Sequence, residues 1–93
     1  MGELGKHIQG ARQKRGLTVR ALAEAMGKTA GYLSRVETRD EIPSPELICR
    51  LGDVLKEKPE TLLRLAKEDM MKRTKEQIEK KSKEALTLYR RSR

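Results

Sequence analysis

Residues 16–36 contain two short helical patterns that are separated by a single glycine, Gly27. Thr18 and Thr29 precede the two patterns, and threonine is a residue type that caps helix N-termini. Gly27 can adopt the left-handed conformation that ends a helix, so the second helix begins almost at once. Apolar positions follow helical spacing on both sides of the turn, at Leu22, Ala23, Met26, Leu33 and Val36. The segment therefore predicts a helix, a tight turn and a second helix, which in a basic chain points to DNA.

The net charge of +8 is concentrated in two parts of the chain. Residues 1–39 carry a net charge of +5 and residues 69–93 carry another +5, whereas residues 40–68 carry −2. A polyanion such as DNA favours Lys and Arg on the surface that it contacts, because binding releases its counterions. The alternative is a basic surface that is only solvated. For the charge of residues 69–93, this alternative and DNA binding are equally good explanations.

The sequence gives little support for an enzyme or for a metal-binding protein. The chain has one cysteine, Cys49, and one histidine, His7, so neither a disulfide framework nor an all-protein zinc site can form within one chain. The sequence contains no glycine-rich phosphate loop and no hydrolase triad. We therefore expect no enzymatic activity, no cofactor and no bound metal. Since no apolar run approaches the roughly 18 residues of a membrane span, we also expect a cytoplasmic protein without membrane contact.

Apolar spacing and capping signals predict an all-α fold. Ser44-Pro45-Glu46 marks a helix start, because serine caps, proline fits the first helical position and glutamate complements the helix dipole. No glycine or proline interrupts residues 60–93, so this part either continues as one helix or bends near residues 67–69. The helices are expected near residues 2–15, 18–26, 29–38, 44–56, 59–67 and 68–90. The core is expected to be aliphatic, with Leu4, Ile8, Leu22, Met26, Leu33, Val36, Ile48, Leu51, Leu55 and Leu62.

A series of motifs extends over residues 3–66. It consists of Leu4-Gly5 with Ile8 and Arg12, Gly16-Leu17-Thr18, Leu33-Ser34-Arg35-Val36-Glu37, Ile42-Pro43-Ser44 with Leu51 and Leu55, and Pro59-Glu60-Thr61-Leu62-Leu63. Together these motifs resemble the Cro/cI-type (XRE) helix-turn-helix family. The resemblance implies a five-helix lambda-repressor-like DNA-binding domain at residues 1–67. Residues 68–93 have no counterpart in that domain and are interpreted as a basic helical extension.

The resemblance also implies which side chains approach DNA. In the family, the third helix enters the major groove while the second lies across the backbone. The implied DNA-binding positions lie in or beside these two helices: Arg20, Lys28, Thr29, Ala30, Gly31, Tyr32, Ser34, Arg35, Thr38 and Arg39. Arg12 and Glu37 resemble a structural ion pair that ties the family's first helix to the end of the third.

Base recognition is predicted to depend on few side chains. The family often has glutamines at the positions of Val19 and Ala30, where one orients the other, and this polar clamp is absent here. Arg35 is the one long side chain able to form a bidentate contact with guanine. A phosphate contact or an intramolecular ion pair is the alternative for it. Asp40 and Glu41 are expected to face away from the duplex.

The leading functional hypothesis is a sequence-specific DNA-binding transcriptional regulator that acts as a dimeric repressor. A homodimer on double-stranded DNA is expected, because one copy would contact few bases. Its interface is expected at apolar residues near the start of the C-terminal extension: Leu63, Leu65, Met70 and Met71. The extension itself has a weak heptad seam, since Thr74 and Lys81 occupy two of its three d positions. An antitoxin-like or bridging adaptor that binds a protein partner through residues 68–93 is the alternative function.

Overall fold

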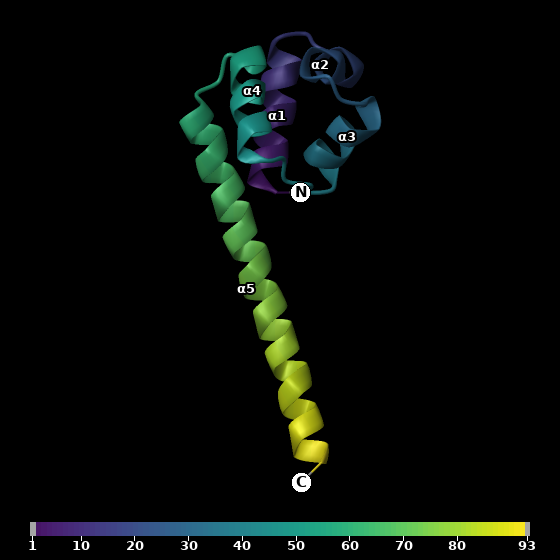
Figure 1. Cartoon of the computed structure of the whole chain (residues 1–93), viewed down its shortest axis with the longest axis vertical. Helices are drawn as coiled ribbons and strands as arrows, with labels where there is room; N and C mark the ends of the chain where they lie inside the picture. Colours follow the sequence, from purple (N-terminus) through teal and green to yellow (C-terminus); the bar gives the residue numbers. More distant parts are fainter. Residues whose placement is uncertain (1, 93) are drawn as a thin grey trace.

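Five α-helices form the regular structure of residues 2–92, the part of the chain that the computed structural model describes, and no strand occurs there. They are α1 (Glu3–Lys14), α2 (Val19–Met26), α3 (Ala30–Thr38), α4 (Pro45–Leu55) and α5 (Pro59–Arg91). The first four helices and the beginning of α5 form a head, from which the rest of α5 projects (Figure 1). We call residues 2–69 the head and residues 70–91 the tail. The predicted all-α fold is confirmed.

Local capping signals set the boundaries of the central helices. At the starts of α2, α3 and α4, the side-chain oxygens of Thr18, Thr29 and Ser44 accept backbone hydrogen bonds of 3.0, 3.1 and 3.4 Å. Gly27 ends α2 with a φ of +66°, in the left-handed region that glycine enters without steric cost. These interactions hold α2 and α3 on either side of a tight turn, as the sequence predicts.

An aliphatic core lies between the helices of the head. All ten side chains predicted for it are buried, and Ala11, Ala23 and Ala66 join them. Cys49 in α4 is half-buried. At Gly5, α1 approaches the end of α3 so closely that a Cβ atom would come within 2.6 Å of the Glu37 carbonyl oxygen. Glycine at this position therefore allows α1 and α3 to pack together.

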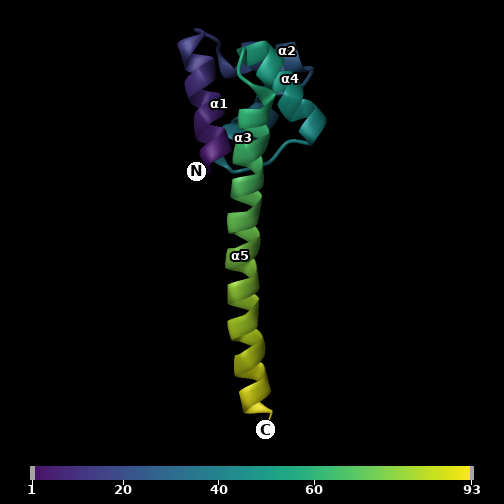
Figure 2. The same cartoon turned by 90° about the vertical axis from the view of Figure 1, so that its left-hand side faces the viewer.

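The C-terminal part of the chain is one continuous helix. The segments expected at residues 59–67 and 68–90 both belong to α5. Of the two alternatives, the continuous helix is confirmed and the bend near residues 67–69 is wrong. Leu62 and Ala66 from its first turns enter the core, whereas every residue from 70 to 92 is exposed. Figure 2 shows the same division, with the upper part of α5 against the head and the lower part alone. No residue of the tail belongs to the core of its own chain.

Asp69 in α5 caps the beginning of α1. The N-cap residue of α1 is a glycine and supplies no side-chain oxygen. Instead, the Asp69 carboxylate accepts hydrogen bonds of 3.0 Å from the backbone N–H groups of Glu3 and Leu4. One turn further, the Arg73 guanidinium donates to the carbonyl oxygen of Asp40 in the α3–α4 loop. Because of these contacts, the start of the tail is fixed to the head at two places.

Candidate nucleic-acid interface

The N-terminal turn of α3 is exposed on the side of the head away from α5 (Figure 1). Leu33 and Val36 anchor the helix in the core, and Thr29 caps its start. The first backbone N–H groups of a helix carry the positive end of its dipole and lack partners within the helix. This end of α3 is therefore accessible and suited to a negatively charged partner.

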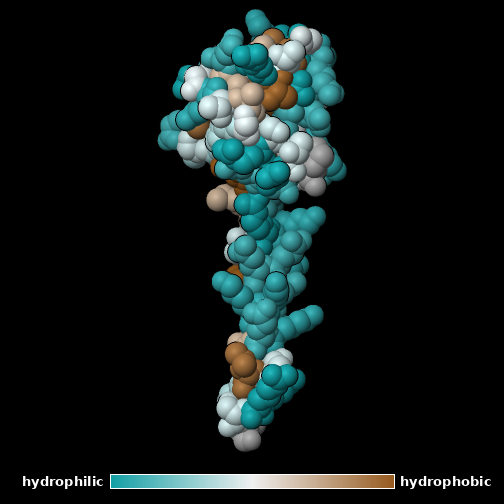
Figure 3. Space-filling model, turned by 90° about the vertical axis from the view of Figure 1, so that its right-hand side faces the viewer, coloured by the Kyte–Doolittle hydropathy of each residue, from teal (hydrophilic) through white to brown (hydrophobic). Residues whose placement is uncertain are grey.

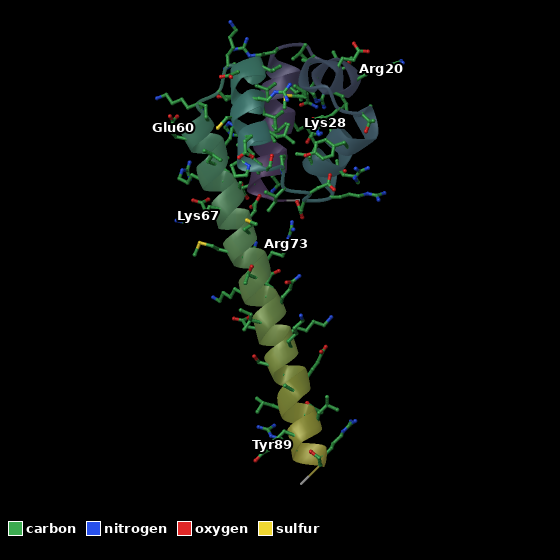
Figure 4. The ribbon with its side chains drawn as sticks, viewed as in Figure 1. Arg20, Lys28, Glu60, Lys67, Arg73 and Tyr89 are labelled. Atoms are coloured by element: carbon green, nitrogen blue, oxygen red, sulfur yellow. The ribbon has the colours of Figure 1, made fainter. Side chains whose placement is uncertain are left out.

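Nine of the ten residues assigned to DNA binding from the sequence are exposed, and the tenth, Tyr32, is half-buried against the core. They lie on α2, on α3 or directly beside these helices. Figure 4 shows Arg20 at the outer edge of the head on this side, far from Tyr89 near the end of the tail. The fold thus brings the assigned residues together on one part of the surface.

Gly31 leaves open space in the first turn of α3. A Cβ atom there would meet nothing closer than the Arg35 Nη1 atom at 3.8 Å and the Thr29 Oγ1 atom at 4.0 Å. Its φ is not in the left-handed region that favours glycine. Neither packing within the head nor backbone conformation therefore requires a glycine at this position.

Arg35 takes part in an intramolecular cluster at the surface. Its Nε atom lies 3.5 Å from Glu41 Oε2, with about half of the Arg35 side chain exposed (48%) and 40% of Glu41. The guanidinium lies 5.8 Å from the centre of the Tyr32 ring, and Lys28 Nζ lies 5.6 Å from the same ring. Glu41, expected from the sequence to face away from the duplex, thus contacts Arg35, one of the residues assigned to DNA binding. The chain reverses at Asp40, where φ is +57°, and the Glu41 N–H donates to the Arg35 carbonyl oxygen.

The surroundings of Tyr32 raise the pKa of its phenol above the ordinary value. Burial raises the pKa of the Tyr32 phenol, the Glu41 carboxylate raises it further and the Arg35 guanidinium opposes the rise. The phenol therefore carries its proton at neutral pH, and a protonated phenol can donate a hydrogen bond to an oxygen of a partner.

Arg12 and Glu37 form a buried, bidentate ion pair between α1 and α3. Arg12 Nε donates to Glu37 Oε2 at 2.8 Å, and Arg12 Nη2 donates to Glu37 Oε1 at 3.1 Å. The third nitrogen, Nη1, donates to the Leu17 carbonyl oxygen at 2.8 Å. The pair lies at the place that the sequence indicates, and it fixes the inner face of α3 against α1.

The four residues assigned to a dimer interface divide into two groups. Leu63 and Leu65 are half-buried against the core, so each already has apolar partners within its own chain. Met70 and Met71 are exposed. Together with Leu63 they line an apolar groove between α5 and the beginning of α4, whose other walls include Ile42, Pro43 and Ile48.

Two contacts at or near this surface were not predicted from the sequence. Glu41, the acidic residue that contacts Arg35, lies in a loop whose conformation local patterns do not specify. The cap that Asp69 provides joins residues 66 positions apart, and no local motif marks such a pairing. In residues 2–92, no three His, Cys, Asp or Glu side chains gather as metal ligands would, and no helix is both long and apolar enough to cross a bilayer.

The chain was compared with protein families and with solved structures. Residues 3–66 match a family model described as "Helix-turn-helix domain". The crystal structure of SinR, a master regulator for biofilm formation, in complex with DNA is similar with a TM-score of 0.59 and 31% identity, covering 64% of this chain and 97% of that chain. No curated protein sequence matches significantly.

Two crystal structures of ClgR, the clp gene regulator from Corynebacterium glutamicum, are also similar. One has a TM-score of 0.59 at 33% identity and covers 72% of this chain and 87% of that chain. The other has a TM-score of 0.61 at 28% identity and covers 83% of each chain. The family match spans most of the present chain, including the whole α2–turn–α3 unit. The chain therefore belongs to the XRE-type helix-turn-helix family and has its lambda-repressor-like fold.

Proposed function

We propose that the protein is a sequence-specific transcriptional regulator that binds double-stranded DNA through α3 and acts as a dimeric repressor. The exposed, capped N-terminus of α3 is the observation that carries this proposal, because it presents Ala30, Gly31 and Arg35 on a rigid element. Membership of a family that includes SinR, which was crystallised with DNA, supports the same assignment.

In the proposed complex, α3 lies in the major groove and α2 crosses the sugar-phosphate backbone. Gly31 allows close approach to the base edges, and the Ala30 methyl can contact a thymine methyl. Arg35 would leave Glu41 and form a bidentate contact with guanine, whose O6 and N7 atoms match the guanidinium. Arg20 and Arg39 would contact phosphates, where charge contributes affinity without sequence preference.

The proposed regulator is a homodimer that binds paired half-sites. Half-sites one turn of DNA apart, or a multiple of it, match the two-fold symmetry of such dimers. Of the residues assigned to the interface, Leu63, Met70 and Met71 remain candidates because they line the apolar groove. Leu65 is removed from the set because it packs on the core.

Selection of bound sites from random duplexes, followed by binding isotherms at several salt concentrations, tests the function. Arg35→Ala is expected to cost about 1–3 kcal/mol, mainly on the selected site. Arg39→Ala is the matched control, because it should weaken selected and random DNA alike and reduce the salt dependence. Equal losses on both DNAs for Arg35→Ala would remove its role in base recognition, and failure to enrich any sequence would reject sequence-specific binding.

A further inference from the structure

The tail has an apolar stripe that nothing in its own chain covers. Met71, Ile78 and Leu88 are 62%, 59% and 65% exposed. The spacing of Met71, Thr74, Ile78, Lys81, Ala85 and Leu88 alternates between three and four residues, so these side chains follow one side of the helix. We call these six residues the stripe. Such spacing is the pattern by which one helix packs along another.

The stripe continues onto the head at one end only. Met71 is part of the apolar groove, together with Leu63 and Met70 from α5 and with Pro43 and Ile48 from the head. At the opposite end of the stripe, the exposed side chain of Leu88 forms a small apolar patch, whereas Leu86, two residues earlier, lies on another side of the helix. Figure 3 shows hydrophobic surface near the end of the tail, separated from the head by a mostly hydrophilic stretch.

The groove and the distal patch cannot meet within one chain. Leu88 lies about 26 Å along the helix from Met71, at about 1.5 Å per residue, and α5 is unbroken between them. A second copy of the chain can bring its own patch to this groove. This requires that two α5 helices run in opposite directions.

The charge distribution along α5 favours the same orientation. Residues 68–79 carry four acidic and three basic side chains, whereas residues 80–91 carry one acidic and five basic side chains. Parallel pairing would place the two strongly basic halves side by side and would bring Lys81 against its own copy. Antiparallel pairing instead places each basic half beside a mildly acidic one, which reduces the repulsion.

We propose that the stripe and the groove dock α5 of a second copy in antiparallel orientation. In this arrangement Leu88 of each chain lies level with Met71 of the other, Ala85 with Thr74, and Lys81 with Ile78. The aliphatic stem of Lys81 covers Ile78 while its ammonium group stays in water. The inference rests on the homodimer of the proposed function and specifies its geometry.

The two heads then lie at opposite ends of the paired helices. Equivalent Ala66 residues are separated by about 40 Å along the helices, at about 1.5 Å per residue. The heads make no contact with each other across this distance. The operator is accordingly expected to have half-sites more than one turn of DNA apart.

Crosslinking of full-length variants tests the orientation. In a Cys49→Ala background, Met71→Cys and Leu88→Cys proteins are treated with a short bismaleimide, each alone and as an equimolar mixture. We expect a covalent dimer severalfold more abundant in the mixture than in either single protein. Leu86→Cys is the matched control for Leu88→Cys, because Leu86 is also an exposed leucine but lies about 200° around the helix from Leu88. Efficient crosslinking of each variant to itself would indicate parallel pairing and overturn the proposal.

Sedimentation equilibrium in the absence of DNA provides the second readout. The wild-type chain is expected to be dimeric, and Leu88→Arg is expected to weaken dimerisation severalfold without affecting the fold, since Leu88 is outside the core. A monomeric wild type would overturn the proposal. Leu88→Arg should still bind a single half-site as the wild type does. If neither protein binds DNA while the crosslinking pattern is retained, the proposed function fails and the antiparallel pairing stands.

Discussion

Replacing Arg12 with methionine tests how strongly a buried ion pair holds α1 to α3. Arg12 and Glu37 are only 11% and 2% exposed, and two hydrogen bonds of 2.8 and 3.1 Å join them. Arg12→Met keeps much of the aliphatic stem but removes the guanidinium. The Glu37 carboxylate would then be buried without a cationic partner, and the Leu17 carbonyl oxygen would lose its donor.

The expected loss follows from this desolvated charge. Breaking a buried ion pair by removing one partner costs about 3–5 kcal/mol, because the remaining charge is uncompensated. The matched control is Arg64→Met, which breaks an ion pair of 3.0 Å whose side chains are 61% and 53% exposed. An exposed pair of this kind contributes about 0–1 kcal/mol. The two substitutions are chemically identical, so the difference between them measures the effect of burial.

Urea unfolding followed by far-ultraviolet circular dichroism at one fixed protein concentration measures both free energies. The fixed concentration keeps the contribution of dimer dissociation comparable between variants. Arg12→Met is expected to lose several times more stability than Arg64→Met. In the double variant Arg12→Met/Glu37→Leu, the loss should be smaller than the sum of the two single losses. Equal losses for Arg12→Met and Arg64→Met would refute the reasoning.

Three further substitutions address the recognition surface and its support. Glu41→Gln releases Arg35 and should raise DNA affinity more than Glu46→Gln, which removes the same charge from the first turn of α4; equal increases in binding isotherms would show that only net charge matters. Gly31→Ala should raise the free energy of unfolding by at most about 1 kcal/mol while weakening DNA binding, because the added methyl fills open space in the first turn of α3; unchanged affinity would place Gly31 outside the interface. Asp69→Ala removes the cap of α1 and should lower stability by about 0.5–2 kcal/mol; unchanged thermal unfolding would contradict that role.

The parts of the fold that the sequence predicts are those determined by near neighbours. Thr18, Gly27 and Thr29 act within their own turns, so the boundaries of α2 and α3 follow from residue type alone. The core follows from helical periodicity in the same way. The continuity of α5 is consistent with the absence of Gly and Pro, but the sequence alone leaves a bend possible, because a helix without a packing partner has no tertiary contacts to specify its path.

The contacts that the sequence does not predict depend on loop conformation or on distant segments. Glu41 meets Arg35 because the backbone reverses at Asp40 in a left-handed conformation that residue type does not dictate. Asp69 reaches the first turn of α1 only because α5 crosses the head at that point. Leu65 has an apolar partner only in the assembled core. In each case the partner is chosen by tertiary packing, about which a local pattern carries no information.

The two ion pairs of α3 differ in a way that matches their positions on the helix. Glu37 faces inward, where its bidentate contact with Arg12 is shielded from water and expensive to break. Arg35, two residues earlier, faces outward, and its single contact with Glu41 is longer and about half exposed. An exposed pair contributes little stability, so a partner with acceptors matched to the guanidinium can replace Glu41 at low cost. The proposed recognition by a rigid helix requires this difference, because the inner pair would keep α3 fixed while Arg35 leaves Glu41 for DNA.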